Sequence, residues 1–380
     1  MNRPGYYRDT GDRRKSNMFG FVRGMHMDWP LLFGLLILSV IGLAVLYSAS
    51  GQDWGEMNKQ IVRLALAFFV MFLVAQIPPH HLLFWTPFIF GLGVVLLFIV
   101  LLFGDVGKGA QRWLDLGVFR FQPSEIMKIA VPMMVAWYLA EKSIPPKPMQ
   151  IWIVFIIIMI PVALIIKQPD LGTALLVGSA GIFVLLLTGI SSLMIGGFVL
   201  TLAAIMPVVW FYVMHDYQRQ RVLTFINPES DPLGSGYHII QSKIAIGSGG
   251  AYGKGWLNGT QSQLDFLPER STDFIFAVYA EEFGLIGILF LLVVYLCIVL
   301  RGLRIAYQAQ GTFTRLLAGS LVITFFVYVF VNIGMVSGLL PVVGIPLPMV
   351  SYGGTSMVTL MAAFGILMSI QTHRKLLTNQ

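Results

Sequence analysis

Long apolar runs separated by short polar connections make up most of the sequence. The hydrocarbon core of a bilayer is about 30 Å thick, and an α-helix needs about 20 consecutive apolar residues to cross it. Runs of roughly this length predict ten membrane-spanning helices, at residues 30–48, 61–77, 85–103, 124–140, 151–166, 171–189, 193–214, 274–300, 316–338 and 348–370. The sequence therefore predicts an all-α polytopic integral membrane protein.

One polar connection is much longer than the others and divides the predicted helices into two groups. Loops of this length inside a compact protein are usually functional. Within it, Ile239, Ile240, Ile244 and Ile246 fall on one side of a predicted short helix, which we expect to lie on the membrane surface. We expect a polar tail at 1–29, seven helices in 30–214, a large outer loop at 215–273, three helices in 274–370 and a tail at 371–380.

The composition excludes a soluble globular protein. Hydrophobic residues make up 57% of the 380 residues and charged residues only 11%, and the mean hydropathy is +0.79. An average soluble domain carries about 25% charged residues. The single cysteine, Cys297, excludes a disulfide scaffold, and no run of residues has the spacing of a metal cluster.

The distribution of Lys and Arg predicts which side of the membrane the termini occupy. With both termini in the cytoplasm, the inner segments hold 13 of the 25 Lys and Arg residues but only 4 of the 18 acidic residues. Cytoplasmic loops of membrane proteins carry such an excess of Lys and Arg. Orientation and contact with anionic lipids therefore explain the net charge of +7 better than nucleic acid does.

The predicted outer connection at 104–128 is rich in charged groups, which are costly near a bilayer and indicate function. Its basic residues favour an anionic ligand such as a phosphate, because arginine side chains and helix N-termini both bind phosphate. Glu125 lies three residues before Lys128, on the same helical face, so a purely structural ion pair is the alternative. The basic residues are Lys108, Arg112, Arg120 and Lys128.

Other acidic residues lie at predicted helix ends, and each allows two interpretations. Asp170 suits either the N-cap of the next helix or a ligand contact. Asp273 suits either an N-cap or a partly desolvated carboxylate that accepts a proton from a sugar hydroxyl. Glu281 and Glu282 lie deeper in the same helix and need partners, for which a basic residue is the simplest expectation.

Several long motifs resemble those of the SEDS family (shape, elongation, division, sporulation). The longest is NIGMVSGLLPVVGIPLPMVSYGGTS at 332–356. The others are KGAQRWL at 108–114, FQPSEIMK at 121–128, QPDLGT at 168–173 and LPERSTDFIF at 267–276. Ser271 departs from the pattern, because many relatives have His there. The amino-acid sequence of the long loop is most similar to those of the elongation branch of the family.

The resemblance implies a peptidoglycan glycosyltransferase that polymerises lipid II at the periplasmic face of the bacterial inner membrane. It also implies a class B penicillin-binding protein, a transpeptidase, as partner, together with other proteins of the elongation complex. A divalent cation, Mg²⁺ or Mn²⁺, often assists members of the family. The resemblance places the catalytic carboxylate at Asp273, an important pair at Glu125 and Lys128, and substrate contacts at Arg112, Trp113 and Arg120.

Given the chemistry of lipid II, we expect a specific glycosyl transfer reaction. Asp273 would deprotonate the 4-hydroxyl of the acceptor sugar, which attacks the anomeric carbon of the donor and inverts the linkage from α to β. The basic groups would stabilise the departing undecaprenyl pyrophosphate. A flippase for lipid-linked precursors is the alternative, although a transporter holds its site near the membrane midplane. A passive scaffold would tolerate replacement of Asp273 and Lys128.

Overall fold

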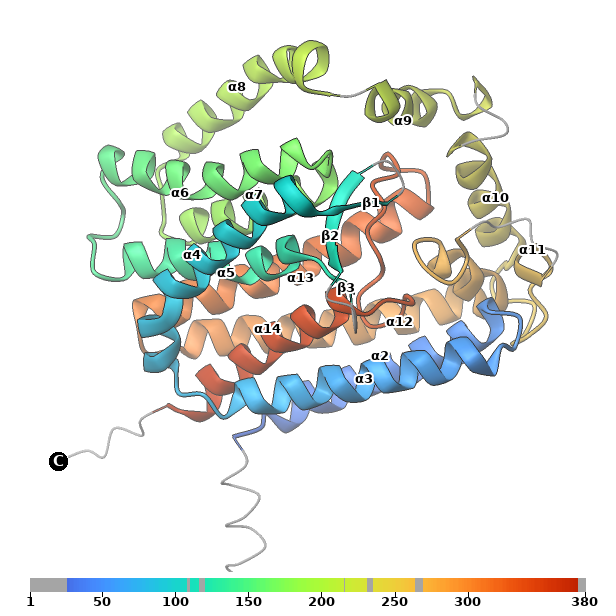
Figure 1. Cartoon of the computed structure of the whole chain (residues 1–380). Helices are drawn as coiled ribbons and strands as arrows, with labels where there is room; N and C mark the ends of the chain where they lie inside the picture. The colour runs from blue at the N-terminus through green and yellow to red at the C-terminus, as the bar shows by residue number, and fades with distance from the viewer. Residues whose placement is uncertain are drawn as a thin grey trace, which may run out of the picture.

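In the part of the chain that the structure describes, ten apolar helices form the body of the molecule. Their arrangement is drawn in Figure 1. The computed structural model describes residues 26–107, 110–115, 120–214, 216–230, 235–263 and 269–374. The ten helices are α2 (Trp29–Ala49), α3 (Trp54–Ala75), α4 (Pro79–Phe103), α5 (Pro123–Ala140), α6 (Pro148–Lys167), α7 (Leu171–Leu187), α8 (Ser192–Val208), α12 (Ile275–Gln308), α13 (Thr312–Val336) and α14 (Thr355–Thr372).

The predicted helical membrane fold is confirmed, and each predicted span overlaps one of these helices. In the part of the chain that the structure describes, eight helices are long and apolar enough to cross a membrane. The other two are α7, which has only 17 residues, and α5, which begins with a charged pair. Both pack against several neighbouring helices of the bundle and against each other.

Several helix ends differ from the prediction for local reasons. α3 begins at Trp54 rather than at residue 61, because the Asp53 carboxylate accepts a hydrogen bond from the backbone N–H of Gly55 at 2.7 Å. α12 continues past Arg301 to Gln308, because the Arg301 guanidinium forms an ion pair with the buried Asp28 carboxylate. The charge of Arg301, which suggested the end of a helix, is thus neutralised by the N-cap residue of α2.

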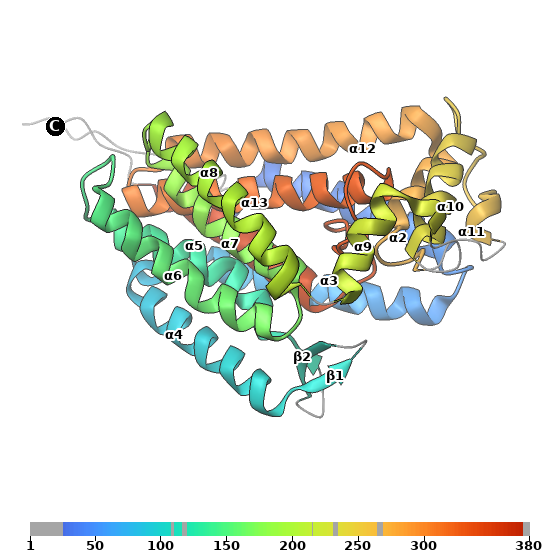
Figure 2. The same cartoon turned by 90° about the horizontal axis from the view of Figure 1, so that it is seen from above.

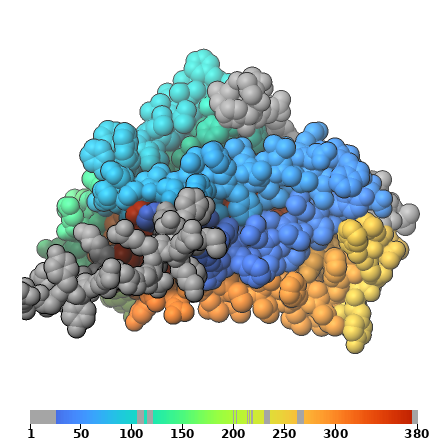
Figure 3. Space-filling view, turned by 90° about the horizontal axis from the view of Figure 1, so that it is seen from below, coloured from blue at the N-terminus to red at the C-terminus, as the bar shows by residue number. Residues whose placement is uncertain are grey.

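The centre of the bundle is formed by α5 and α13. α13 packs against α5, α7, α12 and α14, and most of its residues are buried. Viewed from above, α4 and α6 lie to one side of this pair and α12 to the other (Figure 2). The opposite face of the molecule is covered by α2, α3 and α4, with α12 along one edge (Figure 3).

α8 lies along the outside of the bundle (Figure 1). Within the described residues it packs chiefly against the π-helix that follows it, η1 (Val209–Val213), and no residue of this span is buried. Its exposed side chains are mostly apolar, which suits contact with lipid.

A small sheet that the all-α prediction missed joins α4 to α5. Its antiparallel strands are β1 (Asp105–Gly107), β2 (Ala110–Asp115) and β3 (Arg120–Phe121), in the order β1-β2-β3. Paired strands satisfy backbone hydrogen bonds within this short connection between two helices. The sheet carries Arg112 and Trp113 close to the first turn of α5.

In its described residues, the long connection before α12 folds into three short α-helices, α9 (Asp216–Ile226), α10 (Ser235–Ser248) and α11 (Thr260–Gln263), with a 3-10 helix, η2 (Pro228–Ser230), between α9 and α10. α10 contains the predicted helix, but it does not simply lie on a membrane surface. Its residues Ile239, Ser242 and Ala245 are buried against the bundle, where α10 contacts α12 and α13. The Ser242 hydroxyl donates a hydrogen bond to the Val336 carbonyl at 2.8 Å. We call the end of the bundle that carries this connection and the sheet the loop end.

Candidate active site

A cavity of about 310 Å³ opens at the loop end of the bundle, between the start of α5, the turn before α7 and the segments that precede α12 and α14. Lys108 lies outside the described residues, and so does the side chain of Arg120, whose backbone belongs to β3. The remaining five residues predicted for the site all line this one cavity: Arg112, Trp113, Glu125, Lys128 and Asp273.

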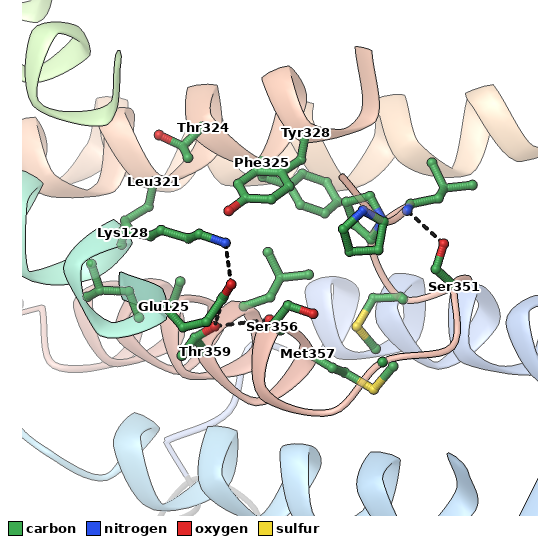
Figure 4. Close-up of a pocket in the computed structure, with 18 residues that line it drawn as sticks. Glu125, Lys128, Leu321, Thr324, Phe325, Tyr328, Ser351, Ser356, Met357 and Thr359 are labelled. Atoms are coloured by element: carbon green, nitrogen blue, oxygen red, sulfur yellow. Dashed lines mark hydrogen bonds and ion pairs between the residues drawn. The ribbon is translucent and has the colours of Figure 1, made fainter. Parts of the chain in front are cut away.

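Glu125 and Lys128 form a buried ion pair in the first turns of α5 (Figure 4). Lys128 Nζ lies 2.6 Å from Glu125 Oε1, and the two side chains are only 11% and 7% exposed. The other carboxylate oxygen accepts a hydrogen bond from the Thr359 hydroxyl at 3.1 Å. The ammonium group also lies 5.0 Å from the ring centre of Tyr328. The pair is therefore fixed by α13 and α14 as well as by its own helix.

A second, smaller pocket of about 60 Å³ lies against the same ion pair (Figure 4). Its wall is mostly apolar and includes Leu321, Phe325 and Leu360. Glu125 and Lys128 line both this pocket and the larger cavity, so they lie at the boundary between apolar and polar surroundings. Charge interactions are stronger at such a boundary than in water, because fewer water molecules screen them.

Arg112 is held in the cavity by the turn between α6 and α7. Its Nε lies 3.4 Å from Asp170 Oδ2, and its guanidinium donates a hydrogen bond to the Pro169 carbonyl at 3.2 Å. Asp170 also caps α7 by accepting from the backbone N–H of Thr173 at 3.2 Å. The N-cap interpretation of Asp170 is confirmed, and the same carboxylate orients a cation of the cavity.

Asp273 lies in the last turn before α12, at the edge of the cavity. The N-cap interpretation of this residue is wrong, because Phe274 takes the N-cap position without a capping hydrogen bond from any side chain. The Asp273 backbone carbonyl accepts a hydrogen bond from the buried Asn332 amide at 3.0 Å. Asn332 also donates to the Ile345 carbonyl at 2.6 Å, so it ties together two segments that line the cavity.

The segment before α14 comes close to the Asp273 carboxylate. A Cβ atom at Gly344 would lie 3.5 Å from Asp273 Oδ2, and the φ angle of Gly344 is +82°, a conformation that favours glycine. Further along, the Ser351 hydroxyl donates to the Thr272 carbonyl at 2.6 Å, and the Tyr352 N–H donates to the Ser271 carbonyl at 2.8 Å. The backbone on both sides of the carboxylate is thus fixed.

The acidic residues around the cavity do not form a metal site of their own. Among the described residues, no three His, Cys, Asp or Glu side chains come together in a group that could hold a metal ion. Glu125 and Asp170 are each paired with a cation of the chain. These residues therefore do not fit a cage for Mg²⁺ or Mn²⁺ made by the protein alone.

The cavity brings a carboxylate together with fixed cations. Asp273 lies on the segment that leads into α12, whereas Lys128 and Arg112 come from α5 and β2. A carboxylate can take a proton from a hydroxyl group, and ammonium and guanidinium groups bind phosphate oxygens. The arrangement suits a transfer reaction in which a hydroxyl group is the acceptor and a phosphate is the leaving group.

The sequence did not identify every residue that lines the cavity. Tyr328 lies beside Lys128 but belongs to a long apolar run, where an additional aromatic residue gives no signal. Gln122 is buried and donates to Ser124 Oγ at 3.0 Å, next to the start of α5. Tyr352 carries the guanidinium of Arg63 over its ring, at 4.5 Å from the ring centre.

Comparison with known proteins identifies relatives over nearly the whole chain. The model of the FtsW/RodA/SpoVE family, described as "Cell cycle protein", matches residues 29–376. "Peptidoglycan glycosyltransferase MrdB" of Escherichia coli strain K12 is 57% identical over 354 residues, which cover 93% of this chain and 96% of that protein.

Solved structures share the fold. A chain of a peptidoglycan synthase complex, described as showing structural coordination of polymerization and crosslinking, superposes with a TM-score of 0.80 at 31% identity, covering 91% of this chain and 97% of that one. The rod shape determining protein RodA of Thermus thermophilus gives a TM-score of 0.69 at 27% identity, covering 92% and 98%. Motifs, fold and near-complete coverage agree, and the chain belongs to the FtsW/RodA/SpoVE family, the SEDS proteins.

Proposed function

We propose that this protein is a peptidoglycan glycosyltransferase that polymerises lipid II into glycan strands during cell-wall elongation. The observation that carries the proposal is the cavity that joins Asp273 to Arg112 and to the ion pair of Glu125 and Lys128. The name of the Escherichia coli relative, at 57% identity, supports the same activity.

In the proposed reaction, Asp273 is the general base. Its carboxylate takes the proton of the acceptor's 4-hydroxyl while that oxygen bonds to the anomeric carbon of the donor. The bond between the anomeric carbon and the phosphate oxygen breaks on the opposite face, so the configuration inverts from α to β. The bonding electrons leave with undecaprenyl pyrophosphate, and the proton on Asp273 is later released to water.

Arg112 and Lys128 are proposed to stabilise the charge that develops on the departing diphosphate. Each cation is already oriented by a carboxylate, Arg112 by Asp170 and Lys128 by Glu125. Oriented donors need little rearrangement during the reaction, which is why such groups contribute strongly to catalysis. Trp113 lines the same cavity and offers a flat apolar surface for the substrate.

The proposed contacts of Lys108 and Arg120 with the substrate rest on the sequence, since their side chains lie outside the described residues. Assistance by Mg²⁺ or Mn²⁺ also stays a proposal. Magnesium usually keeps several waters and binds one or two carboxylates together with substrate phosphates. A cation that arrives with the diphosphate therefore needs no metal cage built by the protein.

We propose that the loop end faces the periplasm and that both termini lie in the cytoplasm. The excess of Lys and Arg in the inner segments supports this orientation. The described ends of the chain also lie together at the other end of the bundle, where the rings of His26 and His373 stack with centroids 3.9 Å apart. A class B penicillin-binding protein is the proposed partner, supported by the likeness to a chain of a peptidoglycan synthase complex.

The test is polymerisation of purified lipid II by the protein in detergent, where no membrane separates two sides and a flippase would make no product. We expect glycan strands from the wild type and at least a hundredfold slower synthesis from Asp273→Asn, since a general base contributes roughly 10²–10⁴-fold. Asp216→Asn, at an exposed position of α9, is the matched control and should keep full activity. A normal rate from Asp273→Asn would contradict the proposal.

A further inference from the structure

The helix that follows Asp273 is broken close to the loop end. Gly284 has φ +64° and ψ −162°, which is not a helical conformation, so α12 consists of a short first segment up to Phe283 and a long second segment. In the first segment, every residue from Phe274 to Glu282 is at most 3% exposed. Asp273 is therefore attached to a fully buried helical segment that the break separates from the rest of α12.

Residues 249–255 of the long connection fill this break with their backbone. The N–H groups of Lys254 and Gly255 donate to the carbonyls of Glu281 and Glu282, both at 3.0 Å. The N–H groups of Leu285 and Ile286, which begin the second segment, donate to the carbonyls of Gly250 and Ala251 at 2.9 and 3.1 Å. The inserted segment thus replaces helical hydrogen bonds on both sides of the break.

Three glycines permit this close contact of two backbones. A Cβ atom at Gly249 would fall on the Ala280 carbonyl, and one at Gly253 would fall on the Glu282 carbonyl. A Cβ atom at Gly284 would fall on the backbone nitrogen of Gly253. Larger residues would force the two backbones apart.

The Glu281 carboxylate fastens the inserted segment in place. Its Oε1 atom accepts hydrogen bonds from Lys254 Nζ at 2.7 Å, from the Thr260 hydroxyl at 3.0 Å and from the Gln261 N–H at 3.0 Å. The side chain is fully buried. The expected pairing of Glu281 with a basic residue is confirmed, and this contact also connects the first segment of α12 to the long connection.

Contacts with α2 hold the same assembly from the other side. The Ser48 hydroxyl donates to the Glu282 carboxylate, which is 1% exposed. The indole N–H of Trp256 donates to the Ala44 carbonyl at 3.0 Å. We call Glu281 and the inserted residues 249–255, which include Lys254, the clasp.

We propose that Glu281 is a positioning residue for Asp273, acting through the clasp; this inference rests on the proposed function. Asp273 precedes Glu281 by eight residues, of which those from Ile275 onward are helical, so the two acids lie on the order of 10 Å apart. A tilt of the first segment by about 5° at the clasp would move Asp273 by about 1 Å. Displacements of that size can cost roughly a hundredfold in rate, so the clasp contributes to the geometry of the base from the helix side, in addition to the hydrogen bonds that Asn332 and the segment before α14 make to residues 271–273.

The test combines kinetics with hydrogen exchange on the full-length protein in detergent. For Glu281→Gln we expect kcat for lipid II to fall at least tenfold, with KM within twofold of wild type. Amide exchange in residues 274–284 should become faster, while α13 stays as protected as in the wild type. Lys254→Met should give the same loss of kcat and the same faster exchange, and it replaces Glu281→Gln as the test if that variant fails to fold. Lys254→Arg keeps the positive charge and should have a kcat close to that of the wild type.

Arg301→Gln is the matched control, because it removes an ion pair of the same helix at the far end from Asp273. We expect unchanged kcat and unchanged exchange in 274–284. The proposal is overturned if Glu281→Gln keeps wild-type kcat, or if kcat falls while 274–284 exchanges as slowly as in the wild type. Hydrogen exchange can be measured without turnover, so it tests the role of the clasp separately from the enzymatic activity. Failure of the proposed function would instead appear as a wild-type protein that makes no glycan strands.

Discussion

Replacing Lys128 by Met should leave Glu125 as a buried carboxylate without its counterion. The two side chains are 11% and 7% exposed, and their charged atoms lie 2.6 Å apart, so solvent can do little to replace the lost partner. Removing one member of such a pair costs about 3–5 kcal/mol. The free energy of unfolding should therefore fall by about 3–5 kcal/mol at pH 7.

The same reasoning predicts the effect of removing both charges. The double variant Glu125→Gln with Lys128→Met removes both charges and should regain most of the lost stability while remaining inactive.

Unfolding in detergent at pH 7, followed by tryptophan fluorescence, measures these differences, and lipid II polymerisation measures activity. The reasoning fails if the Lys128→Met variant unfolds like the wild type, or if the double variant is no more stable than the single one. Full activity of the double variant would remove both residues from the site.

Two further changes probe the cavity directly. Arg112→Gln removes a cation that Asp170 orients. Because a charged hydrogen bond is worth about 1.5–3 kcal/mol, kcat/KM for lipid II should fall roughly 10- to 150-fold. An unchanged kcat/KM would show that Arg112 does not contact the diphosphate. Gly344→Val places a branched side chain beside the Asp273 carboxylate at a φ of +82°, and the polymerisation rate should drop at least tenfold. Gly91→Val is the control, because nothing lies within 4 Å of the added Cβ there. Equal rates from the two variants would contradict the packing argument.

Much of the helical architecture could be predicted from the sequence, because a bilayer requires apolar runs of nearly fixed length. The ends of helices were less predictable. Arg301 suggested the end of a span, yet α12 continues because Asp28, far away in the sequence, neutralises it. The break at Gly284 lies inside a single predicted span, where a glycine gives no periodic signal, and only the inserted residues 249–255 explain it.

The candidate site could be predicted in part for a related reason. Glu125 and Lys128 stand out at the start of a predicted membrane span, so their positions alone drew attention to them. The choice of Asp273 as the base rested on the family motif, because its position alone also suited an N-cap. Their partners could not be found in this way. The pairing of Arg112 with Asp170 joins residues 58 positions apart, and Tyr328 is one aromatic residue among many in α13. Both contacts depend on how α5, α7 and α13 pack together.

The most direct test is a structure of the Asp273→Asn variant with lipid II bound. We predict the diphosphate against Arg112 and Lys128, with a sugar hydroxyl within hydrogen-bonding distance of the residue 273 side chain. A diphosphate bound away from this cavity, with residue 273 touching no sugar, would contradict the account.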